Sequence, residues 1–196
     1  MRKVMPTYTL IALNIAVYIY TAFLSGNLVI MGENVTNVYG QYNQRVFNGA
    51  WWQLFTAMFV HFDIRHILGN MFFLLIFGLR AEELFSLHEY LAIYFLSGLA
   101  GNLLTLLLGP SVVSAGASGA IFGLFGACVI YMRRLIGQSI MAALMYAFFL
   151  LMMSFLPGVN ILAHFGGLVV GLLMGYGLAV TRKHKIIRGY RYSFMV

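Results

Sequence analysis

The feature that most restricts the fold of this sequence is a series of long apolar runs that charged residues almost never interrupt. A helix needs about 20 consecutive apolar residues to cross a bilayer, and these runs reach that length. Charged residues make up only 9% of the chain and hydrophobic residues 62%, whereas a soluble domain carries about 25% charged residues. Too few charges remain to cover a water-facing surface. The sequence therefore predicts an integral membrane protein.

The runs predict an all-α membrane protein with six transmembrane helices. A transmembrane β-barrel is disfavoured, because its strands alternate apolar and polar residues and these runs are continuous. We expect a single domain over residues 1–196, with a long first outer loop after the first helix and a basic cytoplasmic tail over residues 181–196. The expected helices cover residues 8–31, 66–84, 88–108, 115–132, 139–155 and 161–180.

Positive charge is distributed unevenly over the predicted segments. With the N-terminus inside, only Arg45 and Arg65 of the 12 Lys and Arg residues lie in outer segments. Inner loops of membrane proteins carry the excess of Lys and Arg, so both termini are expected in the cytoplasm. The net charge of +7 is then explained by topology and by contact of the basic tail with anionic lipid. Nucleic acid is not an expected partner.

Polar side chains are unfavourable inside a bilayer, so each one near a predicted helix is a functional candidate. His66 and Asn70 are four residues apart and project from one face of the second helix. Ser118 lies about one turn into the fourth helix, and His164 about three residues into the sixth. These helices all enter from the outer side, so we expect the four side chains at one depth. Taken singly, each residue has a simpler explanation, such as a Ser bonded to its own helix or a His in a gate or proton relay.

Small residues recur every fourth position on two of the predicted helices. Such stripes let helix backbones approach closely, and packing of these two helices would bring Ser118 near His164. A Ser hydroxyl becomes nucleophilic when a base within hydrogen-bonding reach takes its proton, and His is the usual base. The stripes alone would indicate only helix packing. Their members are Ala115, Gly119, Gly123 and Ala127 on the fourth helix, and Ala163, Gly167, Gly171 and Gly175 on the sixth.

Three motifs in this sequence resemble those of the rhomboid family of intramembrane serine proteases. Residues 116–119 (GASG) match the family's G-x-S-G motif, and residues 163–167 (AHFGG) match its motif around a histidine. Residues 61–70 (HFDIRHILGN) match H-x4-H-x3-N. The motifs fall in the family's order on helices two, four and six, and the resemblance covers the whole chain. It implies a six-transmembrane-helix rhomboid bundle, in the minimal form typical of prokaryotes.

The resemblance assigns catalytic roles to four residues. Ser118 would be the nucleophile and His164 the general base, forming a dyad without a carboxylate. His66, Asn70 and the backbone N–H of Ser118 would form the oxyanion hole. Removal of one donor from such a hole typically lowers the catalytic rate about 10²–10³-fold. The sequence predicts no metal site, no cofactor and no nucleotide-binding motif, and it lacks H-E-x-x-H.

The resemblance also assigns supporting roles. Phe122 occupies a position where bacterial relatives often have a Tyr stacked on the catalytic His, and His61 matches a structural position that is expected to hydrogen-bond within the loop. A Trp-Arg pair that is frequent in the family's first loop is absent, since Trp52 is followed by Gln53. Supporting glycines are expected at Gly116, Gly119 and Gly167.

The function expected from the resemblance is hydrolysis of peptide bonds in or beside transmembrane segments of other membrane proteins, in the cell (plasma) membrane. The partners would be transmembrane protein substrates and the lipid bilayer. Substrate would enter beside the Met- and Phe-rich fifth helix, whose apolar residues are equally consistent with a surface that faces lipid. The alternatives are a non-catalytic relative that escorts membrane clients, which would lack the Ser or the His, and a small transporter, which would need polar residues across the full bilayer depth.

Overall fold

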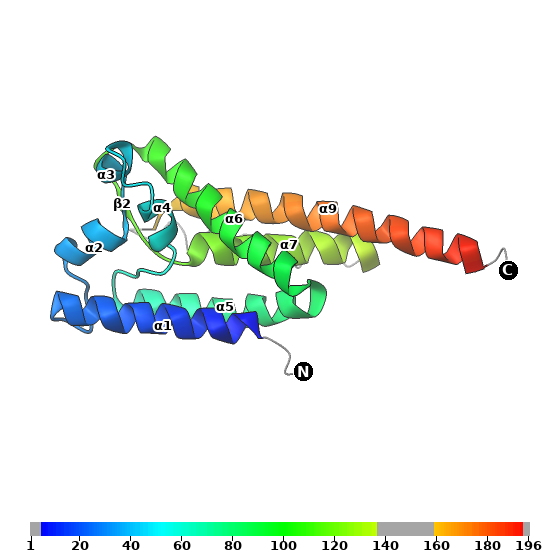
Figure 1. Ribbon diagram of the computed structural model, residues 1–196, viewed down its shortest axis with the longest axis horizontal. Helices are drawn as coiled ribbons and strands as arrows, with labels where there is room; N and C mark the ends of the chain where they lie inside the picture. The colour runs from blue at the N-terminus through cyan, green and yellow to red at the C-terminus, as the bar shows by residue number, and fades with distance from the viewer. Residues whose placement is uncertain (1–4, 137–158, 194–196) are drawn as a thin grey trace.

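The computed structural model describes residues 5–136 and 159–193, and these are mostly helical (Figure 1). Within that part of the chain, five helices are long and apolar enough to cross a membrane, so the protein is a multi-pass membrane protein. The predicted helix over residues 139–155 lies outside the described residues. The five helices are α1 (Pro6–Ser25), α5 (Ile64–Leu84), α6 (Leu87–Thr105), α7 (Ser118–Ile136) and α9 (Ile161–Ser193).

The segment predicted as a long polar loop after the first helix is folded into short elements instead. Strand β1 (Gln41–Tyr42) pairs antiparallel with β2 (Val113–Ser114), which joins this segment to the chain just before α7. Three short helices complete it, and a 3-10 turn, η1 (Leu106–Leu108), follows α6. The short helices are α2 (Glu33–Tyr39), α3 (Asn43–Phe47) and α4 (Gln53–Thr56).

The first helix is shorter than predicted, ending at Ser25 rather than at residue 31. Gly26 adopts a left-handed conformation (φ 67°), and its N–H bonds to carbonyls of the last turn, as at many helix C-termini. The apolar residues that follow bend at Leu28 and Val29, after which Ile30 bridges Asp63 and the Met31 N–H bonds to the Phe62 carbonyl at 2.8 Å. Met31 is buried, whereas the three residues before it are exposed, so this apolar stretch is neither helix nor, for the most part, core.

The limits of the other helices also differ from the predictions, and capping side chains explain two of the differences. α5 begins two residues early, because the Asp63 carboxylate accepts a hydrogen bond from the His66 N–H (2.8 Å) and caps the helix. Ser86 and Glu89 form a capping box that starts α6 at Leu87. α7 begins at Ser118 rather than at 115. α9 continues through most of the predicted tail to Ser193, in a stretch rich in Lys, Arg and Ile, which helices accept.

The predicted small-residue stripes pack against each other, which confirms that part of the sequence analysis. A Cβ built on Gly167 would lie 1.9 Å from the Gly119 carbonyl oxygen, and one on Gly171 would lie 2.0 Å from that of Gly123. Backbones in contact leave no room for a side chain. The pairs advance together along both helices, so α7 and α9 are parallel neighbours in the bundle (Figure 1).

The start of α1 and the end of α9 lie toward the end of the bundle opposite the short helices (Figure 1). Among the described residues, ion pairs and side-chain hydrogen bonds between helices lie at this end. Arg182 of α9 bonds to the Glu89 carboxylate at 2.6 Å and to the Leu84 carbonyl at 2.7 Å. Glu82 of α5 accepts a hydrogen bond from the Thr7 N–H at 2.7 Å, which ties the start of α1 to α5.

Candidate active site

Ser118 is the first residue of α7, and a glycine turn delivers it there. Gly116 has φ +126°, a backbone conformation that residues other than glycine rarely adopt. Its N–H donates to the Ala57 carbonyl at 2.8 Å. The first N–H groups of a helix have no partner within the helix and form its positive end. The backbone therefore presents both a hydroxyl and free N–H donors at this point.

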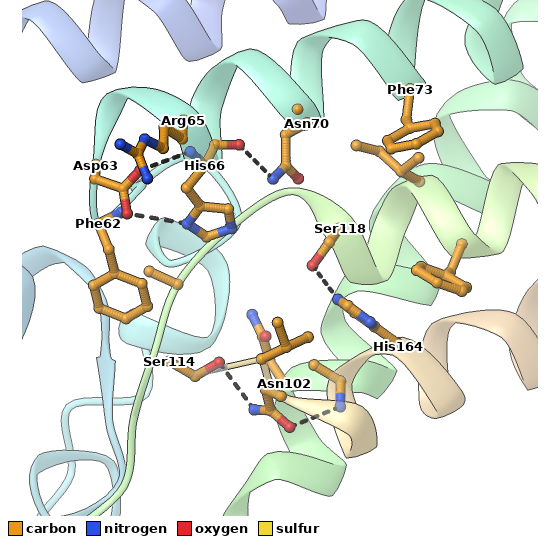
Figure 2. A pocket seen from close by; sticks show the side chains of 18 of the residues that line it. Phe62, Asp63, Arg65, His66, Asn70, Phe73, Asn102, Ser114, Ser118 and His164 are labelled. Atoms are coloured by element: carbon orange, nitrogen blue, oxygen red, sulfur yellow. Dashed lines mark hydrogen bonds between the residues drawn. The ribbon is translucent and has the colours of Figure 1, made fainter. Parts of the chain in front are cut away.

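His164 comes from the first turn of α9 and meets Ser118. Its Nε2 lies 2.7 Å from the Ser118 Oγ, within hydrogen-bonding distance, and Figure 2 shows the two side chains pointing toward each other. Phe122, one turn along α7 from Ser118, stacks on the imidazole with ring centres 4.5 Å apart and planes 17° from parallel. The imidazole is buried, so the stack and the burial restrict its orientation.

His66 and Asn70 face the same site from α5 (Figure 2). The Phe62 N–H donates to Nδ1 of His66 at 3.4 Å, so the neutral ring carries its proton on Nε2. That Nε2 is directed at Gly116: a Cβ built on Gly116 would lie 2.8 Å from it. The Asn70 carboxamide is buried and donates to the His66 carbonyl at 2.9 Å, which leaves it a second N–H.

These side chains line a cavity of about 870 Å³. One part of its wall is polar and the other is aromatic, the latter formed by Phe73, Phe77 and Phe122. Such a volume accommodates several residues of an extended peptide. The polar wall comes from α5, α6, α7, α9 and the chain segments just before α7 and α9, and it includes His66, Asn70, Asn102, Ser114, Ser118, Asn160 and His164.

His61 lies beside His66, and its expected hydrogen bonding within the loop stays a prediction. Its side chain is fully buried, next to the backbone of Phe59. The ring packs edge-on against His66, with centres 5.0 Å apart and planes at 69°. Burial lowers the pKa of His61 to about 3, so the imidazole is neutral at physiological pH. The contact between His61 and His66 is therefore a packing contact of a neutral ring.

Gln53 holds together the segment between α1 and α5, where the Trp-Arg pair that is frequent in the family is absent. Its Nε2 donates to the carbonyls of Asn37 (2.9 Å) and Val38 (3.0 Å). Its Oε1 accepts from the Tyr42 N–H at 3.0 Å. A neutral carboxamide thus holds two turns of the segment together from a fully buried position.

Sequence reasoning did not identify two further carboxamides in the cavity wall. Asn102 of α6 donates to the Leu54 carbonyl at 2.7 Å and fixes α4 against the bundle. Asn160 precedes α9 and donates to the side chains of Thr105 (2.7 Å) and Ser114 (2.9 Å). A polar residue within an apolar helix marked Asn102, whereas Asn160 resembles any residue after a turn.

The structure therefore brings Ser118, His164, His66 and Asn70 around one cavity, with Gly116 and Phe122 in direct contact with them. Gly119 and Gly167 lie at the α7–α9 crossing rather than at the cavity. In the part of the chain that the structure describes, no three His, Cys, Asp or Glu side chains are grouped as metal ligands would be. The arrangement is suited to nucleophilic attack by a hydroxyl with an adjacent base.

Comparison with known proteins identifies relatives over most of the chain. YdcA of Bacillus subtilis (strain 168), a candidate rhomboid protease, is 34% identical over 190 residues, which cover 93% of each chain. RHOMBOID-like protein 6, mitochondrial, of Arabidopsis thaliana is 38% identical over 131 residues, or 64% of this chain and 43% of its own length.

Rhomboid-like protease 3 of Toxoplasma gondii is 33% identical over 134 residues, or 63% of this chain and 50% of its own length. The match thus spans half or less of the plant and Toxoplasma relatives, and nearly all of the bacterial one. The pattern of the Rhomboid domain matches residues 48–181, which contain all three motifs. These matches show that the chain belongs to the rhomboid family.

Proposed function

We propose that this chain is an intramembrane serine endopeptidase that hydrolyses peptide bonds in or beside transmembrane segments of other membrane proteins. The observation that carries the proposal is the 2.7 Å contact between Ser118 Oγ and His164 Nε2. A Ser and a His within hydrogen-bonding distance at the starts of two apolar helices have a ready chemical use as nucleophile and base. The rhomboid membership supports the same reaction class.

In the proposed mechanism His164 takes the proton of Ser118 as Oγ attacks the carbonyl carbon of the scissile bond. The tetrahedral oxyanion accepts hydrogen bonds from the Ser118 backbone N–H, from His66 Nε2–H and from the Asn70 carboxamide. His164 then gives its proton to the leaving amine, the C–N bond breaks, and an acyl-enzyme remains. Water attacks this ester with His164 as base, which releases the new carboxyl end and returns the proton to Ser118 Oγ.

This scheme does not require a carboxylate as a third catalytic residue. Asp63 is the acidic residue beside the oxyanion donors, and its side chain is engaged in capping α5 through the His66 N–H. Burial and the Phe122 ring hold the imidazole of His164 in place. A Ser-His dyad positioned by packing is therefore the proposed catalytic unit.

We also propose six spans, a single domain over residues 1–196 and both termini in the cytoplasm of a cell whose plasma membrane holds the protein. Because α7 and α9 are parallel, the end of α7 and the start of α9 lie on opposite sides of the bundle. The residues between them would have to recross the membrane. Arg80, Arg134 and Arg182 lie at the end opposite Ser118, as the positive-inside rule requires for an outward-facing site.

The test is cleavage of a single-pass membrane substrate by purified protein in liposomes, beside labelling with a fluorophosphonate probe that reacts with activated serines. Ser118→Ala and His164→Ala should abolish both reactions, with losses of at least about 10³-fold. Ser111→Ala, at an exposed serine away from the cavity, is the matched control and should behave as wild type.

Equal cleavage by wild type and Ser118→Ala would show that the proposal is wrong. A folded wild-type protein that neither cuts nor reacts with the probe would also contradict it, and would favour an escort protein. The probe makes this second outcome independent of the choice of substrate.

A further inference from the structure

We propose that Asn160 is a positioning residue that sets the Ser118–His164 contact by linking the two chain segments that deliver them. The inference rests on the proposed function, because it concerns the geometry of the proposed dyad. Asn160 is neither nucleophile nor base, and it is not part of any of the three motifs. Its carboxamide lies in the cavity wall, and its hydrogen bonds reach three different elements.

The oxygen of the carboxamide determines where α9 starts. Oδ1 accepts a hydrogen bond from the Ala163 N–H at 3.0 Å, which is the bond that an N-cap side chain makes to the third residue of a helix. The Asn160 backbone carbonyl accepts from the His164 N–H at 3.3 Å. The first turn of α9, which carries the imidazole, is therefore built directly on this residue.

The nitrogen of the same carboxamide reaches the segment that leads to Ser118. Nδ2 donates to Ser114 Oγ at 2.9 Å and to Thr105 Oγ1 at 2.7 Å, so both of its hydrogens are used. Ser114 ends β2, four residues before Ser118, and Thr105 ends α6. Both hydroxyls are buried, so loss of the donor would not be compensated by bulk water.

One rigid, planar group thus joins the start of α9 to the chain that enters α7. The glycine contacts between α7 and α9 begin where Gly119 packs against the Ala163 carbonyl, 3.1 Å from a Cβ built on Gly119, and continue through Gly119–Gly167 deeper into the bundle. Ser118 and His164 lie at the helix ends, next to the first of these contacts. At that end Asn160 supplies a direct hydrogen-bonded link between the start of α9 and the chain that enters α7. An error of about 1 Å in the Ser118–His164 distance can lower the catalytic rate about 10²-fold.

The experiment compares Asn160→Ser and Ser114→Ala with wild type in liposomes. Ser at position 160 keeps an N-cap oxygen but is too short to reach Ser114 and Thr105, so α9 should still form. Ser114→Ala removes one acceptor without touching the cap. We expect both variants to lower kcat and the rate of fluorophosphonate labelling, Asn160→Ser by about tenfold, with KM within about twofold of wild type.

The double variant should be no worse than Asn160→Ser alone, because both changes remove the same link. The matched control is Asn43→Ser, the same exchange at a buried carboxamide that bonds to the carbonyls of Thr105 and Gly109 and to no residue of α7 or α9. It should lower the thermal midpoint while leaving kcat of the folded protein unchanged.

Wild-type kcat and labelling rates in both Asn160→Ser and Ser114→Ala would overturn the inference, and a lowered thermal midpoint alone would make Asn160 purely structural. Additive losses in the double variant would also contradict it. Failure of the proposed function is recognised separately, because it appears in the wild-type protein as an absence of cleavage and labelling.

Discussion

Two regions of this molecule hold their parts in register by opposite means. Along the α7–α9 crossing, position is set by the absence of side chains: backbones touch at Gly119–Gly167 and Gly123–Gly171. Around the cavity, position is set by hydrogen bonds from buried carboxamides, such as Asn102 to the Leu54 carbonyl. The first device is steric and the second is polar.

The difference follows from what each region must do. A crossing inside the bilayer gains from close backbone contact and has no water to satisfy stray polar groups. The outer region contains irregular backbone whose carbonyls need donors, and neutral carboxamides supply them without burying a charge. We therefore expect substitutions at the crossing to act through stability, and those around the cavity to act more on rate.

The largest effect should come from Gly167→Ala at the crossing. The added methyl would lie 1.9 Å from the Gly119 carbonyl oxygen, so α9 would have to move away from α7, at about 3 kcal/mol of stability. Cleavage should be lost with it, since these helices carry Ser118 and His164. Gly177→Ala on the same helix is the control, because no described atom lies within 4 Å of its new methyl. If both variants unfold at the same midpoint in detergent, steric packing does not explain the crossing.

Gly116→Ala tests the point where the two regions meet. The methyl would force a residue with φ +126° into a strained conformation and approach His66 Nε2 to 2.8 Å. We expect kcat to fall about 10²-fold, as for loss of an oxyanion donor, with about 1–2 kcal/mol lost in stability. Gly109→Ala separates these effects: its φ is +94°, but no described atom is within 4 Å. It should share the loss of stability and keep the wild-type kcat.

Sequence reasoning succeeded where a physical constraint leaves a periodic pattern. The four-residue spacing of small residues predicted the α7–α9 contact, and the depth of polar residues predicted that Ser118 and His164 would come together. The predicted end of the first helix was wrong because apolar residues continue past Gly26, and composition alone does not show where an apolar helix ends. Gly26 itself was the available signal.

The carboxamides escaped prediction for a different reason. Gln53 bonds to backbone carbonyls 15 and 16 residues away in the sequence, and Asn102 to one 48 residues away. Backbone carbonyls exist at every position, so such bonds leave no pattern of residue types. Asn160 bonds to side chains, but only the folded structure brings Thr105 and Ser114 beside it.

Substitutions of Phe122 test whether aromatic packing also contributes to catalysis in the polar region around the cavity. Its ring stacks on His164 at 4.5 Å, so Phe122→Ala should free the imidazole and lower kcat about tenfold, in line with the energy of an aromatic pair. Phe122→Tyr keeps the ring and should stay within about threefold of wild type. Kinetics on the two variants in liposomes give the answer. A Phe122→Ala enzyme with wild-type kcat would leave orientation of the imidazole to burial and hydrogen bonding alone.

The smallest expected effect is a dependence of stability on pH that His61 introduces into the outer region. Its pKa is lowered to about 3 by burial, whereas an imidazole in the unfolded chain titrates near 6.5. Between these values the unfolded chain binds a proton that the folded protein excludes, so stability falls as pH drops from about 6.5 toward 3. Above pH 6.5 both states are neutral, and His61 adds no pH dependence.

His61→Phe removes this titration and keeps an aromatic ring against His66. Thermal midpoints measured in detergent from pH 7 to pH 4 should fall less steeply for this variant than for wild type, whatever its midpoint at pH 7. His88→Phe, at an exposed histidine at the start of α6, is the matched control and should keep the wild-type slope. Equal slopes for His61→Phe and wild type would mean that the buried imidazole gains a proton in the folded state. The outer region would then tolerate a buried charge, which is what the neutral carboxamides around it are expected to avoid.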